Sequence, residues 1–180
     1  RAVKETPPKE RLEDHAIVIG YGPAGVRLVQ VLGDTGIPFV VVEMNPESVS
    51  GLKKDGKNAL YGDATREHIM HAAGIDRAKL VVVVINDPPA RARIVQLARY
   101  MKPTLQVIAR ARRLTEVEQL QTLGADIVVP EEMETTVRIF SHVLGAYMVP
   151  PEEIDAQVRA LRAADYGVLR GSIQEAHLMV

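Results

Sequence analysis

The sequence predicts an α/β protein with a Rossmann-type, doubly wound parallel sheet of six strands, order 3-2-1-4-5-6, followed by a C-terminal amphipathic crossover helix. Short runs rich in Val and Ile, such as residues 80–85, are apolar throughout, as in parallel strands that helices cover on both faces. Helical patterns separate successive runs. Parallel strands joined by helical crossovers account for both observations.

Each element has a short sequence signature. Strands are expected over residues 15–19, 39–43, 58–61, 80–85, 106–109 and 126–129. Helices are expected over residues 24–34, 47–54, 66–73, 90–101, 114–123 and 131–147. A proline in the first turn, which helices tolerate, follows Asn45 and Asp87. A glycine suited to the left-handed conformation follows four of the helices: Gly36, Gly56, Gly74 and Gly124.

The 180 residues are enough for one such domain and an appendage. We expect a linker over residues 1–13, the Rossmann unit over 14–130, a crossover or dimerisation helix over 131–149 and a partly helical C-terminal extension over 150–180. Apolar residues recur at helical spacing along the crossover helix, among them Val137, Phe140 and Leu144. Since an exposed apolar face needs a cover, we expect a homodimer through this helix; packing onto its own sheet is the alternative.

The composition excludes several classes of protein. Lys and Arg number 22 against 23 Asp and Glu, so no basic excess points to nucleic acid as a partner. Cysteine is absent, which removes disulfides, thiolate metal sites and a cysteine nucleophile. No apolar run approaches the roughly 20 residues that cross a bilayer, so the chain itself is expected to be soluble. A charged N-terminal segment without an initiator Met indicates a fragment of a longer protein.

A glycine motif follows the first expected strand and opens the first expected helix. In this G-x-G-x-x-G pattern, Gly20 permits the turn, Gly22 lets the backbone approach phosphates and Gly25 allows close helix–strand packing. The free N–H groups of the helix start would face an anion. Glu43 ends the second strand, where a carboxylate accepts hydrogen bonds from ribose hydroxyls and repels a 2′-phosphate. The sequence thus favours AMP, NAD, NADH, ADP or ATP over NADP.

Several short motifs resemble the RCK family, the regulator-of-potassium-conductance domains also called TrkA N-terminal domains. They are VIGYGPAG at 18–25, VE at 42–43, YGDAT at 61–65, IARAR at 108–112 and GAD at 124–126, and the resemblance spans residues 14–147. The IARAR motif resembles the Kef-type branch. There the domain hangs from the cytoplasmic end of a potassium/proton antiporter, which implies a membrane transporter domain as the attached or associated partner.

The resemblance implies roles for individual residues. Asp63 and Ala64 would border the adenine, Asn86 and Asp87 would line the cleft mouth, and Arg110 would lie near the phosphates or a second anion. From the residues alone, Asp63 or Thr65 has an alternative role as the cap of the following helix. The expected nucleotide-binding set is Gly20, Tyr21, Gly22, Pro23, Ala24, Gly25, Glu43, Met44, Asn45, Asp63, Ala64, Thr65, Asn86, Asp87 and Arg110.

Pro23 stands where glutathione-gated Kef relatives have an arginine, which puts a glutathione site in doubt.

Other polar groups are interpreted as structural. His68 and His71 have a metal-compatible spacing but no evident third ligand, so no metal site is expected. Asp87 with the glutamates that open the last helix is a weaker cation candidate. A solvated helix face is expected for Arg91, Arg99 and Lys102, which share one side of their helix.

No catalytic residue is expected, because the chain carries neither a nucleophile elbow nor a substrate domain. We expect a cytoplasmic nucleotide-binding regulatory domain that controls a potassium or other monovalent-cation transporter, at the cytoplasmic face of the inner membrane. Two alternatives remain open. One is a nucleotide-binding fragment of an NAD-dependent oxidoreductase, and the other is a free-standing regulatory subunit of a potassium uptake system.

Overall fold

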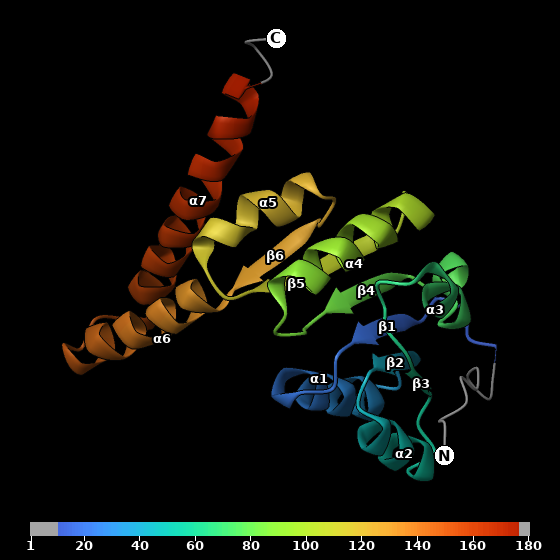
Figure 1. Cartoon of the computed structure of the whole chain (residues 1–180). Helices are drawn as coiled ribbons and strands as arrows, with labels where there is room; N and C mark the ends of the chain where they lie inside the picture. Colours follow the sequence, from blue (N-terminus) through green and yellow to red (C-terminus); the bar gives the residue numbers. More distant parts are fainter. Residues whose placement is uncertain (1–10, 177–180) are drawn as a thin grey trace. The chain divides into compact units, whose positions relative to one another are not determined.

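A computed structural model describes residues 11–176, with side chains as far as Ala163. It confirms the predicted parallel sheet of six strands in the order β3-β2-β1-β4-β5-β6. Helices α1 and α2 lie on one side of this sheet and α4 and α5 on the other (Figure 1). The strands are β1 (Ala16–Ile19), β2 (Phe39–Glu43), β3 (Ala59–Tyr61), β4 (Leu80–Val83), β5 (Gln106–Ala111) and β6 (Ile127–Pro130).

Helices connect the strands at nearly the expected places. The glycines predicted to follow helices all have positive φ, from 68° at Gly36 to 114° at Gly124. The fifth crossover begins with a 3-10 turn, η2 (Leu114–Glu116), instead of being α-helical throughout. The helices of the sheet domain are α1 (Pro23–Asp34), α2 (Pro46–Lys54), α3 (Glu67–Ala72), η1 (Ile75–Arg77), α4 (Pro88–Met101) and α5 (Val117–Thr122).

Aliphatic side chains fill the core, as the scarcity of aromatic residues requires. Val18 on β1 is in register with Val41 on β2 and Val82 on β4. Val18 and Val41 are fully buried beneath Val29 of α1 and Val49 of α2. The register aligns the carboxyl ends of β1, β2 and β4, so the turns that follow these strands share one edge of the sheet.

The prediction that α4 presents a solvated face of Arg91, Arg99 and Lys102 is wrong. Arg91 is 2% exposed. Arg99 donates hydrogen bonds to the Gly124 carbonyl at 2.7 Å and to Asp126 Oδ2 at 2.8 Å, and the Lys102 ammonium donates to the Ala78 carbonyl at 2.7 Å. These cations therefore tie α4 to neighbouring loops, because backbone carbonyls and one carboxylate lie within reach of their long side chains.

The chain divides into two compact units between Val129 and Pro130. The second contains α6 (Glu131–Ala146) and α7 (Pro151–Ala176), and α7 falls within the segment expected to be partly helical. Glu134 of α6 and Arg162 of α7 form an ion pair at 2.6 Å. The linker expected over residues 1–13 lies largely outside the described residues. No described helix is long and apolar enough to cross a membrane.

Candidate functional site

The glycine turn between β1 and α1 combines three backbone requirements. Gly20 has φ +101°, a region open mainly to glycine, and its N–H donates to the Val42 carbonyl at 3.0 Å. A Cβ on Gly25 would lie 2.2 Å from the Gly20 carbonyl oxygen, so only glycine lets the helix approach the turn this closely. A Cβ on Gly22 would meet nothing within 4 Å, which leaves its backbone open to a ligand.

The start of α1 carries an unneutralised positive end. Gly22 is the N-cap residue, no side chain caps the helix, and no acidic residue stands in the first turn. Pro23 follows at the first helical position, where its missing N–H costs nothing. The first N–H groups of a helix and its dipole together attract anions. This end of α1 therefore suits a phosphate.

Glu43 is fixed beside the turn by two backbone hydrogen bonds. Its Oε2 accepts from Tyr21 N at 2.7 Å and its Oε1 accepts from Asn45 N at 2.8 Å. Asn45 in turn caps α2, accepting at Oδ1 from Glu47 N and Ser48 N. Each carboxylate oxygen keeps a further acceptor site. The end of β2 thus holds an oriented carboxylate against the glycine turn.

These elements enclose a cavity of about 330 Å³ at the carboxyl edge of the sheet. Strand order reverses between β1 and β4, which is where open α/β sheets bind ligands. Ser48, Val84 and Ile85 line the cavity although the sequence did not single them out. The predicted residues that line it are Gly20, Tyr21, Gly22, Pro23, Glu43, Asn45, Asn86 and Arg110.

The remaining predicted residues do not line this cavity. Asp63 lies after β3, one strand beyond Glu43, and its Oδ1 accepts hydrogen bonds from Thr65 N at 2.9 Å and Thr65 Oγ1 at 2.8 Å. This contact closes the turn before α3, whose N-cap is Arg66 without a side-chain cap. Ala24, Gly25, Met44, Asp63, Ala64, Thr65 and Asp87 are absent from its lining.

The Asp63 carboxylate is held in its charged form. Burial opposes ionisation, but hydrogen bonds from Thr65 and the positive charges of Arg66 and Arg93 outweigh it and lower the pKa of Asp63. An ionised carboxylate accepts hydrogen bonds only. The side chain of Asp63 can therefore serve only as a hydrogen-bond acceptor.

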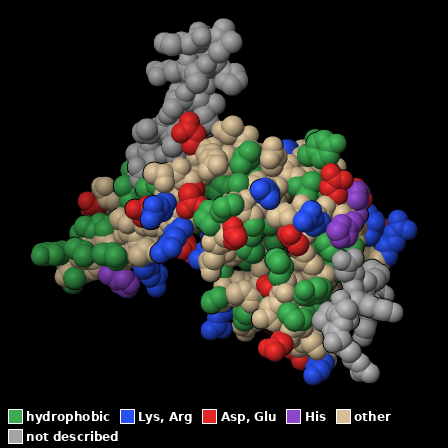
Figure 2. All heavy atoms as spheres, viewed as in Figure 1, with side chains coloured by type: hydrophobic (Ala, Val, Ile, Leu, Met, Phe, Trp, Pro, Cys, Tyr) green, Lys and Arg blue, Asp and Glu red, His purple; other side chains and the backbone are tan. Residues whose placement is uncertain are grey.

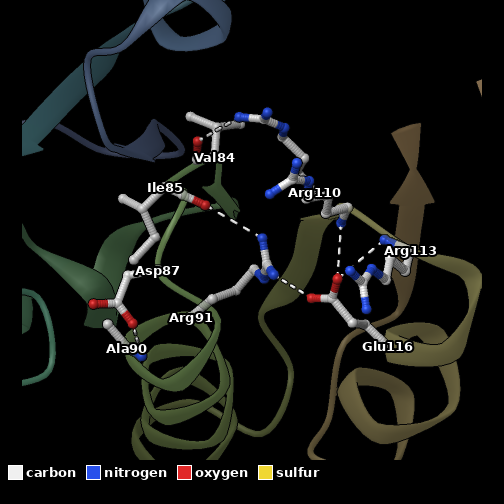
Figure 3. Close-up of polar contacts among 9 residues, drawn as sticks. Val84, Ile85, Asp87, Ala90, Arg91, Arg110, Arg113 and Glu116 are labelled. Carbon is white, nitrogen blue, oxygen red and sulfur yellow. Dashed lines mark hydrogen bonds and ion pairs between the residues drawn. The ribbon is translucent and has the colours of Figure 1, made fainter. Parts of the chain in front are cut away.

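The second half of the sheet presents a cation to the cavity. Arg110, on β5, donates from Nη1 to the Val84 carbonyl at 3.3 Å (Figure 3). Asp87 is the N-cap of α4 and accepts from Ala90 N at 2.9 Å, so its carboxylate has a structural role in this structure. Asn86, which directly precedes Asp87, lines the cavity.

A buried ion pair beside the cavity escaped the sequence analysis. Arg91 in the first turn of α4 is paired with Glu116 of η2, and its Nη1 donates to the Ile85 carbonyl at 3.3 Å (Figure 3). One signal in the sequence pointed to it, because a cation in a first turn opposes the helix dipole and needs a local reason. Glu116 Oε1 also accepts from the backbone N of Arg113, the N-cap residue of η2.

Among the side chains that the structure describes, residues 11–163, no cluster of three or more His, Asp or Glu residues could hold a metal ion. His71 Nδ1 lies 3.2 Å from Asp76 Oδ2. Two carboxylates of the weaker cation candidate have structural roles, since Asp87 caps α4 and Glu134 pairs with Arg162.

Sequence comparison decides the family. The TrkA-N domain family matches residues 16–131. The chain belongs to the TrkA-N domain family. Among curated relatives of this TrkA-N chain, the glutathione-regulated potassium-efflux system protein KefC of Cronobacter sakazakii is 29% identical over 127 residues, covering 71% of this chain and 20% of KefC. The chain thus spans about a fifth of the length of this relative.

Solved structures share the fold of this TrkA-N chain. The TrkA-N domain of the inner membrane protein ybaL from Escherichia coli is 34% identical with a TM-score of 0.70, covering 74% of this chain and 98% of that one. An AMP-bound Kef C-terminal domain from Shewanella denitrificans has 24% identity and a TM-score of 0.74, covering 86% and 94%. The GsuK channel bound to NAD has 25% identity and a TM-score of 0.64, covering 78% and 24%.

Proposed function

We propose that this TrkA-N chain binds an adenine nucleotide and thereby regulates a potassium or other monovalent-cation transporter of the Kef type. One observation carries the proposal: the uncapped start of α1 and the oriented Glu43 carboxylate line the same cavity at the switch point of the sheet. N–H donors for a phosphate and a carboxylate that accepts from ribose hydroxyls fit the two polar parts of a nucleotide.

The ligand's phosphate rests on the open backbone of Gly22 and the first N–H groups of α1. Arg110 on the far side of the cavity supplies a positive charge for a terminal phosphate or a second phosphoryl group. The ribose hydroxyls donate to Glu43. A 2′-phosphate there would place two anions in contact, which disfavours NADP.

The adenine extends toward β3. Asp63 and Ala64 border it, with the ionised Asp63 accepting from the exocyclic amino group. The Asx-type contact from Thr65 leaves lone pairs on this carboxylate, so the turn and the ligand share it. Met44 and Asn45 lie between ribose and adenine in this arrangement.

Similar proteins support both the ligand class and the regulatory role. The GsuK channel has been solved with NAD and with ADP, and KefC is a potassium-efflux system protein. These similarities support a regulatory role at the cytoplasmic face of the membrane that holds the transporter.

The second unit supplies a dimerisation surface in this proposal. Large apolar side chains of α6 and the turn after it are exposed, and Figure 2 shows hydrophobic side chains gathered at the end of this unit. Burying them against a second copy removes apolar area from water. These side chains are Ile139 at 60%, Val143 at 50%, Tyr147 at 81% and Met148 at 88% exposure.

Isothermal titration of the 180-residue chain with AMP, ADP, NADH and NADP tests the proposal. We expect saturable binding of the first three and none of NADP, and loss of binding in Gly22→Val. Mass spectrometry of ligand released from the purified protein identifies the physiological nucleotide. If the chain bound none of the four compounds, or bound NADP as tightly as NADH, the proposed site would be contradicted.

The two other functions make different predictions. A fragment of an oxidoreductase would be preceded or followed in its gene by a substrate domain, and NADH absorbance would change with a substrate. A free-standing subunit of an uptake system would have its own start codon close to Arg1. The gene sequence around this segment separates them from the proposed role.

A further inference from the structure

The buried pair of Arg91 and Glu116 lies beside the candidate nucleotide cavity without lining it. Arg91 is 2% exposed, and the side chain of Glu116 is 20% exposed. In the first turn of α4 the Arg91 cation opposes the helix dipole, and its Nε has no hydrogen-bond partner among the described residues. Such a placement needs compensation, which Glu116 supplies.

The pair links two backbone segments. Arg91 Nη1 donates to the carbonyl of Ile85, a cavity-lining residue beyond the last ladder position of β4. Glu116 Oε2 accepts from Arg91, while its Oε1 accepts from Arg112 N at 3.2 Å and Arg113 N at 3.0 Å. One carboxylate thus joins α4 to the loop that follows Arg110 (Figure 3).

Ile85 connects the pair of Arg91 and Glu116 to the glycine turn. A Cβ on Gly20 would lie 2.8 Å from Ile85 Cγ2 and 3.3 Å from Ile85 N, so the two backbones are in close approach. Ile85 is therefore held from one side by Arg91 and lies against the phosphate-binding turn on the other. A shift of Ile85 would change the space over Gly20.

We infer that Arg91 and Glu116 are positioning residues for the nucleotide cavity: together they hold Ile85 against the glycine turn and fix the loop of Arg112 and Arg113. The inference rests on the proposed function. The pair acts through Ile85 and the backbone of the loop, without touching the nucleotide. Binding should in turn stabilise the hydrogen bonds that Glu116 accepts.

A double-mutant cycle separates positioning from a purely structural role. Apolar replacement of a whole buried ion pair often restores stability, whereas removal of one partner leaves a buried charge. We therefore expect the single variants Glu116→Met and Arg91→Met to lower Tm, and the double variant that combines them to recover it. The double variant still lacks the hydrogen bond to Ile85, so its Kd for AMP should remain about tenfold weaker than that of the unsubstituted chain.

Hydrogen exchange supplies a second readout on the same proteins. Saturating AMP should slow exchange of the Arg112 and Arg113 amides in the unsubstituted chain and leave it unchanged in the double variant. Arg138→Ala, an exposed position on α6, is the matched control and should keep both Tm and Kd.

The outcomes are distinguishable. If the double variant recovers stability and AMP affinity together, the pair is only structural and the inference is wrong. If the variants bind AMP as the unsubstituted chain does, the inference also fails while the proposed function stands. If the unsubstituted chain binds no nucleotide, the proposed function fails, and the positioning role with it.

Discussion

Replacing Gly25 or Gly22 with alanine separates the two demands that the glycine turn meets. Both glycines belong to the same motif, yet their surroundings differ. A Cβ on Gly25 would stand 2.2 Å from the Gly20 carbonyl oxygen, whereas a Cβ on Gly22 would meet no atom within 4 Å. Gly22 also has φ −73° and ψ −169°, which alanine adopts without strain.

The structure sets the size of each effect. To clear 3.0 Å, the Gly25 Cβ or the Gly20 carbonyl must move by at least 0.8 Å from the 2.2 Å contact, and the Gly20 backbone is tied to Val42. Overpacking of this kind costs about 3 kcal/mol, and alanine's better helix propensity returns about 1 kcal/mol. The net loss of about 2 kcal/mol corresponds to a fall in Tm of roughly 4–8 °C.

Gly22→Ala should behave in the opposite way. Alanine is a poorer N-cap than glycine, so the substitution lowers the free energy of unfolding by about 1 kcal/mol or less. Its methyl group, however, occupies the space where the proposed phosphate meets the backbone. We expect at least a tenfold weaker Kd for AMP, about 1.4 kcal/mol. Thermal unfolding without ligand and calorimetry with AMP measure both quantities. A Gly25→Ala protein as stable as the unsubstituted chain, or a Gly22→Ala protein with unchanged affinity, would refute the reasoning.

Three further predictions concern Glu43, His15 and α6. Glu43→Gln should weaken AMP binding by about 1.5–3 kcal/mol, since the neutral amide accepts at only one atom; an unchanged AMP affinity in calorimetry would argue against a ribose contact. Burial lowers the pKa of His15 below 6.5, despite the hydrogen bond to Ala73. The unfolded chain then binds more protons just below pH 6.5, so stability is present above that pH and is lost as pH falls through the lower folded-state pKa. Urea denaturation should show this slope, and His15→Gln should reduce it. Ile139→Asp should convert a dimer to a monomer in sedimentation, with Arg138→Ala as control, and a persistent dimer would point to another surface.

Sequence patterns located the parts of the site that depend on local backbone geometry. The glycine motif predicted the turn because its spacing is a requirement of the β1–α1 connection itself. Glu43 was predicted because it ends β2, and parallel strands that end at one edge bring their last residues together. Asn45 and Asp87 were recognised as helix starts from the prolines that follow them, and both accept hydrogen bonds as caps.

The long polar side chains were harder to place. Arg91, Arg99 and Lys102 fall on one side of a helical pattern, and a cation on a helix surface is usually solvated. Their partners are carbonyls and carboxylates of loops distant in sequence, such as Gly124 for Arg99 and Glu116 for Arg91. Helical periodicity predicts on which side of its helix a side chain lies. It does not predict which residues of a distant loop pack against that side.

The sequence by itself determined the fold class, the strand order and the glycine turn with its neighbouring carboxylate. These follow from local propensity, from the handedness of helical crossovers and from the steric demands of single residues. Only the tertiary structure decided that Arg91 is buried with Glu116 and that Ile85 lies against Gly20. Such contacts join residues remote in sequence, and their energies depend on distances and burial that arise only when the whole sheet has formed.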